Sequence, residues 1–215
     1  MPELAAGYRN PLPAVRPTGL ARRQLAAGTE LWRLEAQAPQ NWCWAGFPQP
    51  RFRFDPASGA FRTRYAGSTV AGAARERYRA TGLLIPADHA EHHLVRLVAA
   101  RPLRVLDLRT ERNLDRLDLD DQISTGQHPA VWRTCQRLSD AVRRWWPDAP
   151  DDPAAPDALD ALVYRSRTTP ESSLNVAIFG ADAFTAQSWP LAGRPDVLAD
   201  LVLHHGFTVG WEIGS

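Results

Sequence analysis

Lysine is absent from this 215-residue chain, so its 25 strongly basic side chains are all arginine. This absence excludes phosphate-binding loops that depend on a lysine, Schiff-base chemistry and any lysine general base. An arginine guanidinium still binds carboxylates and phosphates through a planar fork of donors, but it keeps its proton near neutral pH. The chain can therefore recognise anions, whereas lysine-based proton transfer is excluded.

Cysteine is nearly absent, since only Cys43 and Cys135 occur. Two cysteines without a C-x-x-C spacing exclude a disulfide scaffold and a thiolate zinc site, and they are typical of a reducing compartment. No stretch approaches the roughly 18 apolar residues that a membrane helix requires, and the first residues lack the pattern of a secretion signal. The sequence predicts a soluble, cytoplasmic protein without a membrane partner.

The charges are nearly balanced, because 24 acidic residues oppose the 25 arginines and leave a net charge of +1. No overall field therefore attracts nucleic acid, and direct nucleic-acid binding is not expected. A hydrophobic content of 44% is typical of a globular chain, and the length fits one domain. Residues 1–28 contain four prolines without a clear period, which predicts an N-terminal arm, partly disordered, before a single domain over residues 29–215.

Hydrophobic spacing predicts a mixture of strands and helices. Alternation predicts strands over 30–34 and 61–66, the segment 103–108 is predicted to be a buried strand, and further strands are predicted over 161–164, 174–179 and 207–213. Helical spacing predicts helices over 70–79, 88–100, 130–146 and 195–205, the first capped by Thr69 and the second by a box of Asp88 and Glu91. Residues 148–157 are predicted to form a loop. Because strands and helices do not alternate regularly, an α+β fold is favoured over a doubly wound sheet.

Five polar residues at the ends of these elements are candidates for a functional site, and each has an ordinary interpretation. They are Arg33, Arg53, Tyr65, Glu76 and Ser166. A helical glutamate between arginines usually lies on a solvated, salt-bridged face, a strand tyrosine usually belongs to the core, and a serine after a strand usually belongs to a turn. Residue types alone leave both interpretations open.

The order of these residues resembles the RES-domain family, whose name records an Arg, a Glu and a Ser. The similar segments lie between residues 31 and 184, and they are Leu31-Trp32-Arg33, Phe52-Arg53-Phe54-Asp55-Pro56, the stretch from Tyr65 to Glu76, the strand 103–108, Tyr164-Arg165-Ser166-Arg167, and Asn175-Val176-Ala177-Ile178-Phe179. Asp55 stands where the family often has asparagine, which places a negative charge beside Arg53.

The resemblance implies an ADP-ribosyltransferase-like mixed fold, with central antiparallel sheets flanked by helices. It also implies a toxin of a RES/Xre-type toxin–antitoxin pair that cleaves the nicotinamide–ribose bond of NAD, as a glycohydrolase or a phosphorylase. NAD is then the substrate, no separately bound cofactor is expected, and the implied partner is a helix-turn-helix antitoxin. Transfer of ADP-ribose to a protein target, a non-catalytic module that binds nucleotides or proteins, and homo-oligomerisation stay open.

The resemblance also implies roles for six residues. Breaking an N-glycosidic bond passes through an oxocarbenium-like transition state, which a carboxylate stabilises. Arg33 and Arg53 are implied to bind the diphosphate. Tyr65 is implied to stack on the nicotinamide, and Ser166 to bind the ribose or the amide. The implied catalytic residues are Glu76, Arg53 and Ser166, and the implied substrate-binding residues are Arg33, Tyr65 and Asn175.

Two other patterns suggest different chemistry. His89, His92 and His93 have a spacing that suits metal ligands on a helix, but the H-E-x-x-H arrangement is missing, and exposed helix histidines are the better interpretation. No metal site is predicted. Trp145 and Trp146 beside two arginines are able to stack on nucleic-acid bases, yet their helical spacing favours the edge of a core with a basic rim.

Overall fold

The structure is a computed structural model that describes residues 12–147, 158–167 and 173–213. The loop predicted over 148–157 and the first eleven residues of the predicted arm lie outside the described residues. Within the described ranges, no helix combines the length and the apolar character needed to cross a bilayer.

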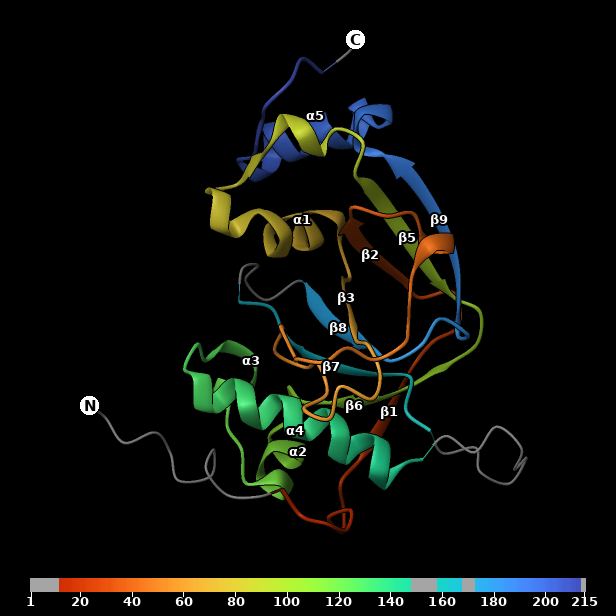
Figure 1. The fold of residues 1–215 in the computed structure, drawn as a ribbon, viewed down its shortest axis with the longest axis vertical. Helices are drawn as coiled ribbons and strands as arrows, with labels where there is room; N and C mark the ends of the chain where they lie inside the picture. The colour runs from red at the N-terminus through yellow and green to blue at the C-terminus, as the bar shows by residue number, and fades with distance from the viewer. Residues whose placement is uncertain (1–11, 148–157, 168–172, 214–215) are drawn as a thin grey trace.

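Eight strands form one sheet in which neighbouring strands are antiparallel except for β6 and β7 (Figure 1). The order across the sheet is β1 (Arg22–Leu25), β6 (Leu103–Asp107), β7 (Ala161–Arg165), β8 (Leu174–Ile178), β3 (Arg64–Gly67), β2 (Glu30–Glu35), β5 (His93–Ala99) and β9 (Phe184–Pro190). A separate parallel pair joins β4 (Leu84–Ile85) to β10 (Thr208–Val209). This mostly antiparallel sheet with flanking helices confirms the predicted α+β class.

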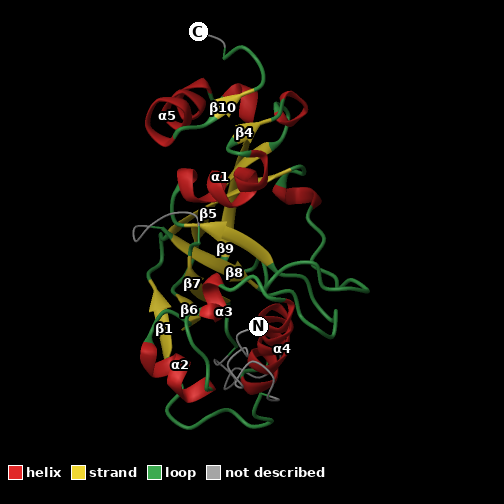
Figure 2. Ribbon diagram, turned by 90° about the vertical axis from the view of Figure 1, so that its left-hand side faces the viewer, coloured by secondary structure: helices red, strands yellow, loops and turns green. Residues whose placement is uncertain are grey.

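The helices lie in two groups along the molecule, and Figure 2 shows the same division from the side. One group lies beside β1, β6 and β7, and it contains α2 (Glu111–Leu117), α3 (Gln122–Thr125) and α4 (Pro129–Trp145). The other group lies near β2 and β5, and it contains α1 (Val70–Tyr78) and α5 (Pro195–His205). Strands β3 and β8 therefore cross the middle of the molecule between the two groups of helices.

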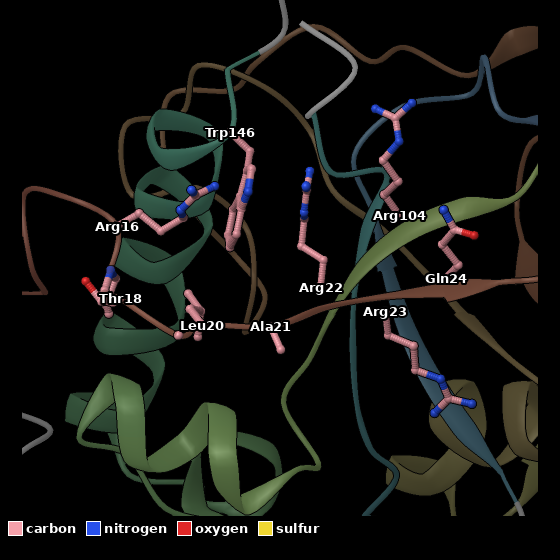
Figure 3. A pocket seen from close by; sticks show the side chains of 11 residues that line it. Arg16, Thr18, Leu20, Ala21, Arg22, Arg23, Gln24, Arg104 and Trp146 are labelled. Carbon is pink, nitrogen blue, oxygen red and sulfur yellow. The ribbon is translucent and has the colours of Figure 1, made fainter.

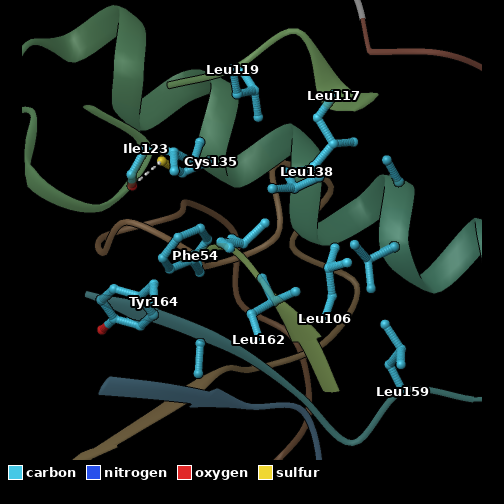
Figure 4. Packing of buried hydrophobic residues seen from close by; sticks show 14 of the residues in the cluster. Phe54, Leu106, Leu117, Leu119, Ile123, Cys135, Leu138, Leu159, Leu162 and Tyr164 are labelled. Carbon is cyan, nitrogen blue, oxygen red and sulfur yellow. Dashed lines mark hydrogen bonds between the residues drawn. The ribbon is translucent and has the colours of Figure 1, made fainter. Parts of the chain in front are cut away.

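Helix α4 covers one end of the sheet because its apolar residues recur at helical spacing, as the sequence predicted. Leu138 and Cys135 are fully buried against Leu106 of β6 and Leu162 of β7 (Figure 4). Each such burial removes a large apolar side chain from water, which stabilises the fold by about 1.5–3 kcal/mol per residue. Pro129 in the first turn and the ring of His128, which accepts the amide hydrogen of residue 130, begin the helix.

The helix predicted over residues 88–100 is wrong, because residues 93–99 form strand β5. Apolar residues at positions 94, 95, 97 and 98 fit a helical face and also a strand between two others. The strand is the stable choice here because β5 pairs with β2 on one side and with β9 on the other. Asp88, predicted to cap the helix, lies instead in the short 3-10 turn Ala87–His89.

The other predicted helices and most strands are confirmed, including Thr69 as the cap of α1. The terminal strand predicted over 207–213 is limited to Thr208–Val209. Strand β1 lies within the segment predicted as an arm, where Arg22–Leu25 pair with Leu103–Leu106 at the sheet edge. Strands β4 and β9 and helices α2 and α3 were not predicted from the sequence.

Candidate active site

A cavity of about 350 Å³ opens where α1, β2, β3 and β8 meet the loop that carries Arg53. Five of the six predicted site residues line it, and they are Arg33, Arg53, Tyr65, Glu76 and Asn175. The sixth, Ser166, follows β7 and hydrogen-bonds to Glu76. The fold therefore brings together residues that lie as far as 142 positions apart in the chain.

Small residues allow α1 to approach β3 and β8 closely. A Cβ atom on Gly67 would lie 3.0 Å from the backbone nitrogen of Ala73, and one on Gly72 would lie 2.2 Å from the hydroxyl oxygen of Ser173. The side chain of Thr69 begins the helix by accepting a hydrogen bond of 3.0 Å from the Gly72 amide. This tight packing sets the position of the last turn of α1, which carries Glu76.

The carboxylate of Glu76 is held by neutral donors from two different strand regions. Its Oε1 accepts a hydrogen bond of 2.9 Å from Asn175 Nδ2 and one of 3.2 Å from the Ser166 hydroxyl. Asn175 is 2% exposed, and its own Oδ1 is buried without a hydrogen-bond partner among the described residues. The carboxylate thus has a fixed orientation while Glu76 stays exposed toward the cavity.

Tyr65 is tied to the neighbouring loop. Its hydroxyl accepts a hydrogen bond of 2.8 Å from the Phe54 amide and donates to Asp55 Oδ1 at 3.2 Å. Burial, with the charge of Asp55 close by, raises the pKa of Tyr65 well above its usual range. The other carboxylate oxygen of Asp55 accepts the backbone amides of Arg51 and Phe52, each at 2.8 Å. Asp55 therefore organises this loop, and Tyr65 presents a neutral phenol.

Arg53 is 5% exposed and is bound to the segment that precedes α4. Its guanidinium donates to the carbonyl of Ile123 at 3.0 Å and to that of Gly126 at 2.5 Å. It also lies 5.6 Å from the ring centre of Trp132, within cation–π range. These contacts hold Arg53 in the cavity wall and fasten the loop around it to the rest of the fold.

Arg33 is paired with a carboxylate. Its guanidinium makes two hydrogen bonds to Glu35 and donates to the carbonyl of Tyr65 at 2.7 Å. Arg64 donates to the same Glu35 oxygen at 2.8 Å, and burial together with the charge of Arg33 lowers the pKa of Arg64 to about 10, although Glu35 opposes that shift. Arg33 and Arg64 therefore share one carboxylate, and the donors of Arg33 are engaged within the protein.

Several cavity residues were not predicted as site residues, chiefly Tyr164, Arg167 and Trp132. Burial raises the pKa of Tyr164 above its ordinary value, and the charge of Glu76 adds to that shift. Trp132 follows the apolar spacing of α4 and was predicted only as a core residue. Arg167 comes after the end of β7, where no period predicts the direction of a side chain. Long-range contacts alone bring these residues to the site.

A second hollow of about 870 Å³ lies away from this site, beside β1 (Figure 3). None of the six predicted site residues lines it. The guanidinium carbons of Arg16 and Arg22 lie 5.2 and 5.9 Å from the ring centre of Trp146, which is 1% exposed. Trp145 is buried as well, so the pair forms the edge of a core with a basic rim, as the helical spacing predicted.

The histidines of the sequence analysis do not lie on one helix. His89 ends a 3-10 turn, and His93 begins β5. The rings of His89 and His92 stack at 3.8 Å, and the ring of His89 meets the hydroxyl of Tyr78 at 3.2 Å. The described part of the chain contains no group of three metal-binding side chains that could hold an ion.

The protein has an α+β fold built on a mostly antiparallel sheet. Residues from several elements line its cavity, and they include a fixed carboxylate and several arginines. The model of the RES domain matches residues 30–197, so the chain belongs to the RES domain family. A chain of the crystal structure of the M. tuberculosis MbcT-MbcA toxin-antitoxin complex has a similar fold, with a TM-score of 0.50 and 16% sequence identity over 79% of this chain and 88% of that chain. No curated protein matches.

Proposed function

We propose that this protein is a toxin that degrades NAD by cleaving the bond between nicotinamide and ribose, as a glycohydrolase or a phosphorylase. The observation that carries the proposal is the convergence of Glu76, the donors Asn175 and Ser166, and several arginines on one cavity. Membership of the RES domain family supports it, and so does a fold shared with a toxin-antitoxin complex.

The proposed reaction breaks the glycosidic C–N bond of NAD. The bonding electron pair moves to the pyridinium nitrogen, so nicotinamide leaves as a neutral molecule. Positive charge then develops on the ribose ring, and the carboxylate of Glu76 stabilises it because a fixed negative charge beside the developing positive charge lowers the energy of the transition state. Water or phosphate attacks the anomeric carbon, and a proton from the attacking water is released to solvent.

The other residues are proposed to position the substrate. Tyr65 lines the cavity and offers an aromatic surface for the nicotinamide ring. Asn175 and Ser166 keep Glu76 oriented, and each has a polar group suited to the ribose hydroxyls or the amide. Arg33 and Arg53 bring positive charge to the cavity walls, where a dinucleotide diphosphate needs it.

The direct test incubates purified protein with NAD, with and without inorganic phosphate, and identifies the products by mass. Release of nicotinamide with free ADP-ribose indicates hydrolysis, whereas a phosphorylated ADP-ribose that forms only with phosphate indicates phosphorolysis. Attachment of ADP-ribose to an added protein would indicate transfer instead. Tight NAD binding without any product over a long incubation would favour a binding module and contradict the proposed activity.

We also propose an antitoxin partner for this chain, of the helix-turn-helix type. The support is the similar fold found in a toxin-antitoxin complex, together with the toxic consequence of unrestrained NAD cleavage. Such a partner neutralises the toxin most simply by covering the cavity, since occlusion stops substrate entry.

A further inference from the structure

We infer that Arg167 is the residue that binds the phosphate groups of the substrate, while Arg33 and Arg53 mainly shape the cavity. This inference rests on the proposed function for the identity of the substrate. Its starting point is the different surroundings of the guanidinium groups that line the cavity: Arg77 is exposed to solvent, whereas Arg33, Arg53 and Arg167 are at least partly buried.

Arg33 and Arg53 already have partners in the protein. Arg33 is bound to a carboxylate and a carbonyl, and Arg53 donates to carbonyls in the segment before α4. A substrate phosphate would have to compete with these bonds, which have short distances and partly buried donors. The guanidinium groups of Arg33 and Arg53 therefore stabilise the cavity wall and have few donors left to bind a ligand.

Arg167 differs because it is half-buried in the cavity and makes no hydrogen bond or ion pair with any residue that the structure describes. Burial lowers the pKa of Arg167, and the nearby charge of Arg53 lowers it further, while Glu76 acts in the opposite direction. A partly desolvated guanidinium that makes no hydrogen bond or ion pair among the described residues gains most from an anion that enters the cavity. The charge of Arg53, which is close enough to lower the pKa of Arg167, attracts the same anion.

The position of Arg167 also suits a dinucleotide. Arg167 lines the same cavity as Glu76 and feels its charge, so the guanidinium lies near the carboxylate proposed to face the reacting ribose. In NAD the diphosphate is joined to that ribose, so one ligand is able to reach both groups. A planar fork of donors matches two phosphate oxygens at once, which a single ammonium group does not.

The test measures the affinity of ADP-ribose and of nicotinamide riboside, which lacks the diphosphate, for Arg167→Gln, Arg167→Lys and Arg165→Gln. Arg165 is a matched control because it is exposed, lies two residues away and pairs with Asp121. We expect Arg167→Gln to weaken ADP-ribose binding by about tenfold to a hundredfold, the effect of losing a charged hydrogen bond, with less than about twofold change for the riboside. Arg167→Lys should recover part of the loss, and Arg165→Gln should bind like the wild type.

Unchanged ADP-ribose affinity in Arg167→Gln, equal losses for both ligands, or no ADP-ribose binding by the wild type would each overturn the inference. Thermal unfolding of each variant identifies a general loss of folding. The outcome is separate from that of the proposed function, because ADP-ribose binding needs no turnover. If the wild type binds ADP-ribose through Arg167 but releases no nicotinamide from NAD, the proposed activity fails and the inference stands.

Discussion

At the residue scale, the arginines of the cavity differ in the partners that their guanidinium groups already have. Arg33 and Arg53 were predicted to grip a diphosphate, because arginine is the only strong cation in the chain and the family resemblance selects these two. The partners of Arg53 lie about seventy residues away in the chain, at Ile123 and Gly126. No local sequence pattern predicts contacts between residues so far apart. The sequence therefore predicted that these arginines line the cavity, but not which arginine has hydrogen-bond donors available for a ligand.

Asp107 carries the clearest pH dependence at the residue scale. It is 2% exposed and accepts hydrogen bonds from Arg109 at 2.7 and 2.8 Å and from Arg23 at 3.1 Å. Burial alone would raise the pKa of Asp107, but the hydrogen bonds from Arg109 and Arg23 outweigh that effect and lower it. The folded protein therefore holds this carboxylate in its charged form more strongly than the unfolded chain does.

We expect Asp107→Asn to lower the free energy of unfolding by about 2 kcal/mol at pH 7, because the variant removes a buried anion that accepts hydrogen bonds from the partly buried Arg109 and the exposed Arg23. A carboxyl group in an unfolded chain has a pKa of about 3.9, so the wild-type advantage is complete above that pH and disappears as the pH falls through the lower folded pKa. Denaturant unfolding at several pH values measures it, with the exposed Asp115→Asn as the control. A stability difference that is the same in acid as at pH 7 would refute this account.

At the scale of elements, the close approach of α1 to the sheet controls where Glu76 lies. The small residues of this segment were recognised in the sequence, and the helix begins at the predicted cap. The orientation of the helix could not be predicted, because it depends on contact with β3 and with Ser173, about a hundred residues further along the chain.

Gly67→Ala tests this contact. The added Cβ would lie 3.0 Å from the backbone nitrogen of Ala73 and push the first turn of α1 away from β3. We expect the free energy of unfolding to fall by about 1–2 kcal/mol, the usual effect of overpacking. The rate of NAD cleavage should fall by more than the loss of folded protein explains. Thermal unfolding and nicotinamide release measure the two effects. Gly193→Ala is the control, since a Cβ there meets nothing within 4 Å.

If Gly67→Ala is as stable and as active as Gly193→Ala, the packing of α1 does not position Glu76.

The sequence-based prediction of secondary structure failed at β5 and β9 because it also depends on distant contacts. Apolar positions in the 88–100 segment fit two periods, and β9 has mostly exposed, uncharged residues without alternation. Only pairing within the complete sheet decides between helix and strand at these places.

At the scale of the whole molecule, the cavity is open, and the proposed antitoxin is expected to control it. Co-expression of the protein with the product of a neighbouring helix-turn-helix gene should restore growth, and the two chains should purify together. The purified complex should release nicotinamide from NAD more slowly than the free protein by at least about tenfold, since a covered cavity excludes substrate. A complex that forms but cleaves NAD at the full rate would contradict neutralisation by occlusion.

The fold class and the RES resemblance were both predictable because they depend on short motifs in a fixed order, whereas the assembled sheet depends on distant pairings. Strand β1 is an example, since four residues of the predicted arm complete an edge of the sheet against β6. Such a short strand has no periodic signal of its own, and its partner lies about eighty residues away.

The central claim is that the carboxylate of Glu76 drives cleavage of NAD in this cavity. The most direct measurement is the rate of nicotinamide release by the wild type, by Glu76→Gln and by Glu111→Gln, an exposed glutamate at the start of α2. We predict that Glu76→Gln lowers the rate by at least about a hundredfold, as the loss of a group that stabilises transition-state charge does, while Glu111→Gln keeps the wild-type rate. A Glu76→Gln protein that releases nicotinamide within about threefold of the wild-type rate would contradict the claim.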